Sequence, residues 1–330
     1  MKDQLSQLFR HERFNRQQAR EALTSLLSSE NNISSIASFI SAFNMRQPDI
    51  EEMHGFIQAM IEMCNKLDLG TQDAIDIVGT GGDGKNTFNI STLSAIVVAA
   101  AGVKVIKHGN YASSSVSGSS NVLETLGYQF TNDQSILRKQ LEATNICFLH
   151  APLFHPVMVK VKQIRKELSL QTFFNLLGPL INPASPSKQV LGVSHHSHIR
   201  KYQYLMQETG KTFCLVHSMD GYDEISLTGH FKIIRNDTVD YLSPEDIGMP
   251  TTRPEELYSG DTIEQAAGIF INILEGKGTD AQKNVVIANA AYAIQCAQPM
   301  LNIYDCLALS KATLESGKAF ETFKKLTDKS

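Results

Sequence analysis

A glycine-rich loop between an apolar strand and an apolar helix is the first place in this sequence where chemistry is expected. Four glycines fall within positions 79–84, after the apolar residues 74–78 and before the apolar segment 91–101. Because glycine has no Cβ, its backbone N–H groups can turn inward and approach a ligand closely. The helix that follows adds free N–H groups and the positive end of its dipole. The loop therefore predicts a binding site for phosphate or another anion.

The glycine loop also fits two common nucleotide-binding patterns, and each of them is incomplete. The spacing G-x-G-x-x-G matches a dinucleotide fingerprint, which requires an acidic residue near the end of the next strand. That strand ends in Lys107, which has the opposite charge. The spacing G-x-x-x-x-G-K, completed by Lys85, matches a P-loop. A P-loop needs serine or threonine at the next position to hold magnesium, and Asn86 stands there.

A third interpretation uses residues from three parts of the chain. Lys107 supplies a cation at the end of the second strand, and the loop 113–120 carries six serines whose hydroxyls can donate to phosphate oxygens. Asp223 and Glu224 form an adjacent acidic pair in a turn after the fifth strand. Such pairs suit magnesium, which takes oxygen ligands and keeps several waters. A magnesium-bound diphosphate is the ligand that satisfies all three features, although an acidic turn is more often only solvated.

The composition is that of an ordinary globular protein. The chain has 330 residues, a net charge of −4, 42% hydrophobic residues and 19% charged residues. The overall charge speaks against nucleic acid as a partner. No signal peptide is recognisable, and the longest nearly apolar run, 95–106, contains Lys104 and is too short to cross a membrane. The five scattered cysteines predict reduced thiols, so we expect a cytoplasmic protein, and the lack of a membrane-spanning run predicts no membrane partner.

Residues 1–69 contain only helical patterns, and residues 70–330 alternate between strands and helices. The first region predicts a small helical domain, whose apolar helices either form a dimer face or pack on each other. We expect 155–183 to return to this domain, with a helix over 156–168 and a tight turn over 174–183. The remainder predicts a mainly parallel sheet flanked by helices, with ligands beyond the carboxyl ends of the strands. The expected strands are 74–78, 103–106, 146–149, 190–193 and 212–216, and the expected C-terminal helices are 262–276, 281–297 and 304–326.

Five motifs in this order resemble anthranilate phosphoribosyltransferases, a family in the nucleoside phosphorylase-like class of phosphoribosyltransferases. They are 79–83, 89–92, 107–110, 175–183 and 220–228, and the resemblance covers essentially the whole chain. Members join the amino group of anthranilate to C1 of phosphoribosyl pyrophosphate (PRPP) and release pyrophosphate, a step of tryptophan biosynthesis. The resemblance implies the α/β fold with a helical N-terminal domain, a homodimer and two magnesium ions per subunit. A pyrimidine nucleoside phosphorylase is the nearest alternative, and a non-catalytic nucleic-acid-binding relative is a further one; neither accounts for the acidic pair.

The resemblance also implies roles for individual residues. The PRPP site would consist of Gly79, Gly82, Asp83, Thr87, Asn89, Ile90, Ser91, Thr92, Lys107, Ser115 and Ser119. Ser91 and Glu224 would hold one magnesium ion, and Asp223 and Glu224 the second. The anthranilate site would consist of Gly79, His108, Asn110, Arg165, Gly178 and Pro179, with Arg165 binding the carboxylate. No residue is assigned as the catalytic base, and His108 is interpreted as orienting its loop. Asp83 would act through water, metal or a ribose hydroxyl.

The sequence departs from the family pattern at four positions near the expected site. Tyr111, Val116 and Gln171 stand where the pattern has basic residues, and Asn121 stands where it has aspartate. Three positive charges and one negative charge are therefore absent. We expect these departures to change affinities and to leave the reaction intact.

Overall fold

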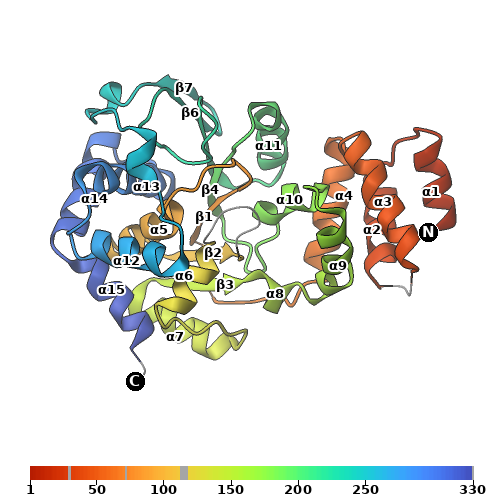
Figure 1. Ribbon diagram of the computed structural model, residues 1–330, viewed down its shortest axis with the longest axis horizontal. Coiled ribbons are helices and arrows are strands. Elements are labelled where there is room, and N and C mark those ends of the chain that lie inside the picture. Colours follow the sequence, from red (N-terminus) through yellow and green to blue (C-terminus); the bar gives the residue numbers. More distant parts are fainter. Residues whose placement is uncertain (29–30, 71–72, 112–117, 329–330) are drawn as a thin grey trace. The chain divides into compact units, whose positions relative to one another are not determined.

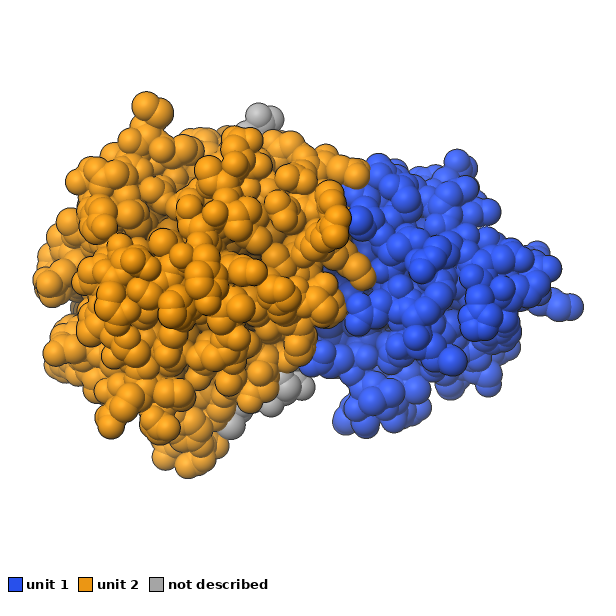
Figure 2. Space-filling view, turned by 90° about the horizontal axis from the view of Figure 1, so that it is seen from above, with its two compact units in different colours: residues 1–67, 151–185 blue, residues 68–150, 186–330 orange. Residues whose placement is uncertain are grey.

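The computed structural model describes the chain except for residues 29–30, 71–72, 112–117 and 329–330. It divides into two compact units, coloured separately in Figure 2. Unit 1 contains residues 1–67 and 151–185, and unit 2 contains residues 68–150 and 186–330. The domain ranges expected from the sequence, 1–69 with 155–183 and then 70–330, differ from these units by a few residues at each boundary.

Unit 1 is entirely helical in its described residues. Its helices are α1 (Lys2–Phe9), α2 (Arg16–Ser28), α3 (Ile33–Met45), α4 (Ile50–Glu62), α8 (Ala151–Phe154), α9 (Val159–Leu168) and α10 (Phe173–Leu177), with 3₁₀ turns at Pro156–Met158 and Gly178–Leu180. The expected tight turn over 174–183 is thus largely helical, because Thr172 and Asn175 form a capping box that starts α10.

Buried phenylalanine rings join the two chain segments of unit 1. Phe173 of α10 packs on Phe56 of α4, with ring centroids 4.9 Å apart, and on Phe43 of α3 at 5.3 Å. Helix α4 begins with a capping box between Asp49 and Glu52. The returning segment therefore completes the hydrophobic core of the helical unit.

Unit 2 contains one seven-stranded sheet in the order β3-β2-β1-β4-β5-β6-β7. The strands are β1 (Ile75–Gly79), β2 (Val105–Gly109), β3 (Ile146–His150), β4 (Lys188–Gly192), β5 (Thr212–Ser218), β6 (Phe231–Arg235) and β7 (Val239–Leu242). The first five strands are parallel to one another, which confirms the predicted mainly parallel sheet. The antiparallel strands β6 and β7 were not predicted.

Helices α5 (Ile90–Ala100) and α13 (Asp280–Ala297) lie against the sheet and against each other, and both are almost fully buried (Figure 1). The other helices of unit 2 are α6 (Ser119–Thr125), α7 (Gln134–Thr144), α11 (His196–Glu208), α12 (Ile263–Leu274), α14 (Ile303–Glu315) and α15 (Lys318–Thr327). The prediction of a single helix over 304–326 was wrong. The helix is interrupted at Gly317, whose φ of 77° is not helical, so two helices form. No helix in the described part of the chain is long and apolar enough to cross a membrane.

Candidate active site

The candidate site begins where β1 and β4 end. Gly79 and Gly192 are paired in the register of these two neighbouring strands, and both are terminal residues. A Cβ added to Gly79 would overlap the carboxylate of Asp223, and one added to Gly192 would overlap the backbone carbonyl of Asp223. Glycine is therefore required at both strand ends, because the acidic turn lies directly on them.

The acidic turn is held in place from β5 and α13. Ser218, the last residue of β5, donates its hydroxyl to the carbonyl oxygen of Glu224 at 2.7 Å. Asn289 in α13 accepts the N–H of Ile225 at 3.0 Å and donates to the carbonyl oxygen of the same residue at 2.9 Å. Because Asn289 is buried in a core helix, the position of the acidic pair follows from the packing of the sheet.

The structure brings both acidic residues to the glycine loop and to the N-terminus of α5. Asp223 Oδ2 accepts the N–H of Gly81 at 2.7 Å. Glu224 Oε1 accepts the hydroxyl of Ser91 at 2.8 Å and its N–H at 3.2 Å. Ser91 lies in the first turn of α5, where free N–H groups and the helix dipole favour a negative charge. The predicted metal residues Ser91, Asp223 and Glu224 therefore lie together in unit 2.

The electrostatics of this cluster favour uptake of positive charge. Burial and the neighbouring Asp223 and Asp83 raise the pKa of Glu224 to about 8. Burial, and then Asp223, raise the pKa of Asp83 to about 6. The pKa of Asp223 is raised as well, chiefly by burial. Three carboxylates thus repel one another in a partly desolvated space, and a cation there would stabilise their charged forms.

Lys107 is the buried cation beside these acids. Its ammonium group donates to the carbonyl oxygen of Ile77 in the neighbouring strand β1. Burial lowers its pKa, while Asp76, Glu224 and Asp223 act in the opposite direction and favour the charged form. The next residue, His108, is also buried, and its N–H donates to Asp76 Oδ1 at 3.2 Å.

The glycine loop itself has the conformation that its sequence predicts. Gly81, Gly82 and Gly84 have positive φ angles of 61°, 71° and 69°, which glycine adopts without steric cost. Asp83 accepts the N–H of Lys85 at 3.0 Å, within the loop. The loop ends at a bridge between Thr87 and Tyr258, immediately before Asn89 and the buried first turn of α5, where Ile90 and Thr92 lie.

The remaining predicted residues of unit 2 follow β2. Ser119, the first residue of α6, donates its hydroxyl to the carbonyl oxygen of Asn110 at 3.3 Å. A Cβ on Gly109 would come within 2.6 Å of the Ser119 hydroxyl, so this approach also depends on glycine. The predicted residue Ser115 and the departure Val116 lie outside the described residues.

Arg165, Gly178 and Pro179 belong to unit 1. The guanidinium of Arg165 donates to Asn175 Oδ1 at 3.1 Å and lies 5.5 Å from the centre of the Phe174 ring. Its Nε is buried and has no hydrogen-bond partner among the described residues. A buried, incompletely satisfied guanidinium is suited to a carboxylate ligand. Gly178 starts the 3₁₀ turn and Pro179 is buried.

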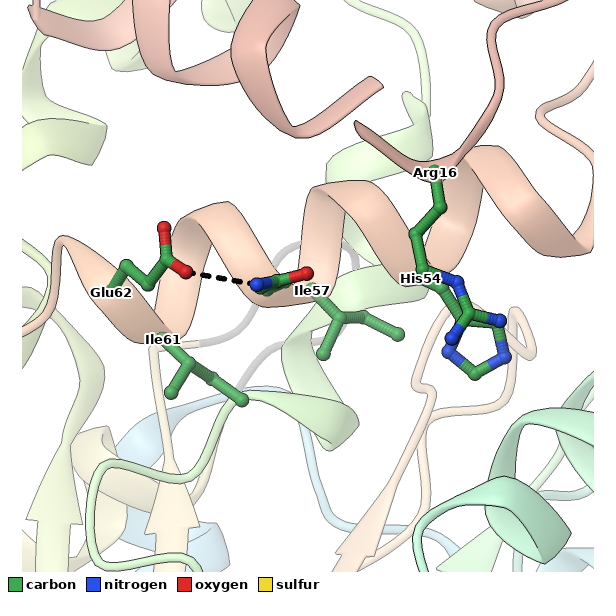
Figure 3. Close-up of a pocket in the computed structure, with 6 residues that line it drawn as sticks. Arg16, His54, Ile57, Ile61 and Glu62 are labelled. Atoms are coloured by element: carbon green, nitrogen blue, oxygen red, sulfur yellow. Dashed lines mark hydrogen bonds between the residues drawn. The ribbon is translucent and has the colours of Figure 1, made fainter. Parts of the chain in front are cut away.

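Unit 1 also carries a pocket of about 360 Å³ along α4, and none of the predicted site residues line it (Figure 3). Arg16, His54, Ile57, Gln58, Ile61 and Glu62 surround it. Gln58 donates to Glu62 at 3.0 Å across one turn of the helix. This pocket therefore contributes nothing to the interpretation of the acidic cluster.

The donor set fits magnesium that is shared with a substrate. Among the described residues, no three His, Cys, Asp or Glu side chains converge as a ready metal site. Ser91 and Glu224 nevertheless present oxygen atoms 2.8 Å apart, and the carboxylates of Asp223 and Glu224 repel each other. Magnesium is commonly held by one or two carboxylates, substrate phosphates and water, so an incomplete protein shell is what this ion requires.

Two family models identify the chain as a two-domain glycosyl transferase. The model of the glycosyl transferase family helical bundle domain matches residues 2–64, and that of the glycosyl transferase family a/b domain matches residues 71–320.

Relatives narrow the class. An anthranilate phosphoribosyltransferase from Cytophaga hutchinsonii is 52% identical over 325 residues, which cover 98% of this chain and 99% of the relative. The crystal structure of the enzyme of that name from Thermus thermophilus has a TM-score of 0.91 at 31% identity and covers 98% of both chains. The Saccharomyces cerevisiae enzyme in complex with PRPP and Mg has a TM-score of 0.90 at 27% identity and covers 98% of this chain and 96% of its own. The chain belongs to the anthranilate phosphoribosyltransferase family, as the five motifs predicted.

Two residues that shape the cluster were not predicted as site residues. Gly192 was predicted only as part of a strand. A glycine at the end of a strand beside the glycine loop indicates that another part of the backbone approaches it closely. Asn289 holds the acidic turn from a helix 64 residues further along the chain. Only the three-dimensional structure shows that contact.

The raised pKa values predict an unusual pH dependence of stability in metal-free protein. Between about pH 5 and 8 the native state binds more protons at Glu224 and Asp83 than the unfolded state does, so the free energy of unfolding falls as pH rises. Glu224→Gln removes the larger of these two contributions, because the pKa of Glu224 is raised further than that of Asp83. The Tm of chelator-treated wild-type protein should therefore fall relative to that of Glu224→Gln from pH 5 to 8. Magnesium should raise the wild-type Tm more at pH 8 than at pH 6, and parallel curves for the two proteins would contradict the explanation.

Proposed function

We propose that this protein transfers the phosphoribosyl group of PRPP to the amine of anthranilate. The products are N-(5-phosphoribosyl)anthranilate and pyrophosphate, in the biosynthesis of tryptophan. The observation that carries the proposal is the contact of Glu224 with Ser91 at the N-terminus of α5, beside Asp223 and Lys107. Such an arrangement can hold a metal ion, a buried cation and backbone donors around a diphosphate leaving group, whose negative charge they would stabilise.

The donor site is proposed to surround the glycine loop. Backbone N–H groups around Gly79 and Gly82 and the first turn of α5 would donate to the diphosphate oxygens. Lys107 would contribute a buried positive charge, and developing charge on the leaving group would be stabilised by these fixed donors. The other proposed donor residues are Asp83, Thr87, Asn89, Ile90, Ser91, Thr92, Ser115 and Ser119.

Magnesium is proposed as the cofactor, with two ions per subunit. Ser91 and Glu224 would hold one ion, and Asp223 and Glu224 the other. When bound, the ions neutralise diphosphate charge. The complex of the yeast relative with PRPP and Mg supports the use of magnesium, and the repulsion among the three carboxylates supports its position in this chain.

The acceptor is proposed to be held through its carboxylate and its ring. Arg165 would bind the carboxylate through a charge-assisted pair, since its buried guanidinium has unsatisfied donor capacity. Gly79, His108, Asn110, Gly178 and Pro179 complete the proposed set. An aromatic amine is already neutral at pH 7, so positioning matters more than a strong base. His108 is proposed only to orient its loop.

Two further expectations stay predictions. The homodimer through the N-terminal helices is one of them, and the large apolar side chains that unit 1 exposes, Phe9 (62% exposed), Ile33 (67%) and Met45 (85%), are the places to test it. The five cysteines are all free and buried, and the cytoplasmic location expected from them is not tested by the fold.

Turnover is the direct test of the proposed function. When purified protein is mixed with anthranilate, PRPP and magnesium, anthranilate should be consumed and its fluorescence should fall. A chelator should stop the reaction. The double variant Asp223→Asn/Glu224→Gln should lower kcat/KM by about 100-fold or more, because it removes charge stabilisation at the leaving group. Asp237→Asn, an exposed aspartate in the turn between β6 and β7, is the control. If wild-type protein shows no turnover at any reasonable substrate concentration, the proposed function is wrong.

Arg165→Ala tests the acceptor assignment separately. Removing a charge-assisted hydrogen-bonded pair costs about 1.5–3 kcal/mol, so the KM for anthranilate should rise roughly 10- to 100-fold, while the KM for PRPP changes little. Lys162→Ala removes an exposed cation from the same helix and should leave both constants unchanged. If Arg165→Ala leaves acceptor kinetics untouched, another residue binds the carboxylate.

Sedimentation equilibrium tests the dimer. The expected mass is about twice the 36.5 kDa of one chain. Charged substitutions on the exposed apolar side chains of unit 1, Phe9→Glu and Ile33→Asp, should shift the protein toward monomer. Met300→Asp replaces a 97% exposed side chain of unit 2 and should leave the mass unchanged. A monomer at all concentrations would refute the proposed dimer.

A further inference from the structure

Tyr111 follows the predicted acceptor residue Asn110 and contacts the protein in two ways. Its hydroxyl donates to Glu124 Oε1 at 3.0 Å. Its ring meets the edge of His150, with ring centroids 4.6 Å apart and an interplanar angle of 70°. The side chain is 43% exposed, so it lies at the surface and still has two defined partners.

The partners of Tyr111 are themselves fixed to the fold. His150 is the buried last residue of β3, and its Nδ1 is hydrogen-bonded to the hydroxyl of Ser120 at 2.9 Å. Ser120 and Glu124 are four residues apart in α6, so they lie on the same face of that helix. Tyr111 thus contacts α6 directly through Glu124 and indirectly through His150. We call Tyr111, Ser120, Glu124 and His150 the Tyr111 cluster.

Two members of the Tyr111 cluster, Tyr111 and Ser120, donate their backbone N–H groups to Asn110. The carbonyl oxygen of Asn110 accepts the N–H of Ser120 and the hydroxyl of Ser119, each at 3.3 Å. Its side-chain oxygen accepts the N–H of Tyr111 at 2.8 Å. That oxygen accepts a backbone N–H, and the amide NH₂ group is the donor that Asn110 can offer to a ligand. Each of the two 3.3 Å hydrogen bonds to the carbonyl oxygen is weak. The direction of the Asn110 amide group therefore depends on the contacts that hold Tyr111, the next residue.

We propose that Tyr111 is a positioning residue for the acceptor, acting through Asn110. The inference rests on the proposed function and adds a residue that the proposed site does not contain. Tyr111 stands where the family pattern has arginine, so in this chain the turn after β2 is held by a neutral hydroxyl and an aromatic contact. Loss of the hydroxyl leaves the ring on His150 and frees the turn from Glu124.

The expected effect is selective. Tyr111→Phe should raise the KM for anthranilate about 3- to 10-fold, the range of one hydrogen bond, with the KM for PRPP changed less than about 2-fold. Glu124→Ala should give the same shift. Glu124→Gln keeps an acceptor oxygen for the tyrosine hydroxyl and should restore a nearly wild-type value. The double variant Tyr111→Phe/Glu124→Ala should be no worse than either single variant, because both remove the same contact.

The control is Tyr204→Phe, a tyrosine of α11 that is 42% exposed and whose hydroxyl is hydrogen-bonded to Arg200 at 3.1 Å. It matches Tyr111 in exposure and in the atom removed, and it should leave both KM values unchanged. The Tm of every variant is measured beside the kinetics. An unchanged acceptor KM in Tyr111→Phe, additive effects in the double variant, or equal rises of both KM values with a lowered Tm would each overturn the positioning role.

Equilibrium binding separates this inference from the proposed function. Anthranilate titrated into the protein, followed by its own fluorescence, reports acceptor affinity without turnover. If wild-type protein binds anthranilate but does not turn over, the proposed reaction fails, and weaker binding by Tyr111→Phe still supports the positioning role. Equal binding by wild-type protein and Tyr111→Phe overturns it. Absence of both turnover and anthranilate binding in wild-type protein overturns both proposals.

Discussion

The seating of Asp223 on two glycine strand ends is the constraint on which the rest of the site depends. Parallel pairing places Gly79 and Gly192 at the same level of the sheet, and the absence of Cβ atoms lets the acidic turn lie on them. From there Asp223 reaches the N–H of Gly81, and Glu224, the next residue, reaches Ser91. One steric condition thus positions both acids against both parts of the anion site, the loop and the helix N-terminus.

The charge balance of this site explains why an anion loop contains acids. Two unit charges about 4 Å apart interact by roughly 4 kcal/mol at an effective dielectric near 20, so three neighbouring carboxylates strongly disfavour full ionisation. Lys107 and the dipole of α5 offset part of this repulsion. A divalent cation offsets the rest and reverses the sign of the local field. In the proposed reaction, bound metal would therefore favour the binding of the diphosphate.

Local sequence patterns predicted most of the fold, and long-range contacts account for what they missed. The five parallel strands are short apolar runs bounded by helices, and this pattern is visible in the sequence. The edge strand β7 was missed because its burial does not follow its hydrophobic pattern: Val239 and Tyr241 are exposed, whereas Asp240 is half-buried. The break between α14 and α15 could have been predicted from Gly317, a helix-ending residue. In the site, the glycine loop, Lys107 and the acidic pair were visible in the sequence. The contacts of Asn289 and Tyr111 depend on which elements become neighbours, and no local pattern shows that.

The departures from the family pattern have different consequences for the charge of the site and for its geometry. A unit charge about 8 Å away contributes roughly 2 kcal/mol at an effective dielectric near 20, whereas the two proposed magnesium ions would bring four positive charges. We therefore expect the neutral residues Tyr111 and Gln171 to change affinities and to leave the reaction intact. Geometry is more sensitive, because a neutral amine acceptor gains its rate from alignment. A position where arginine is replaced by a neutral residue can thus still affect acceptor binding, provided that the new side chain fixes the backbone next to the acceptor site. Tyr111 meets that condition through Glu124 and His150, which belong to a helix and a strand of the same rigid unit.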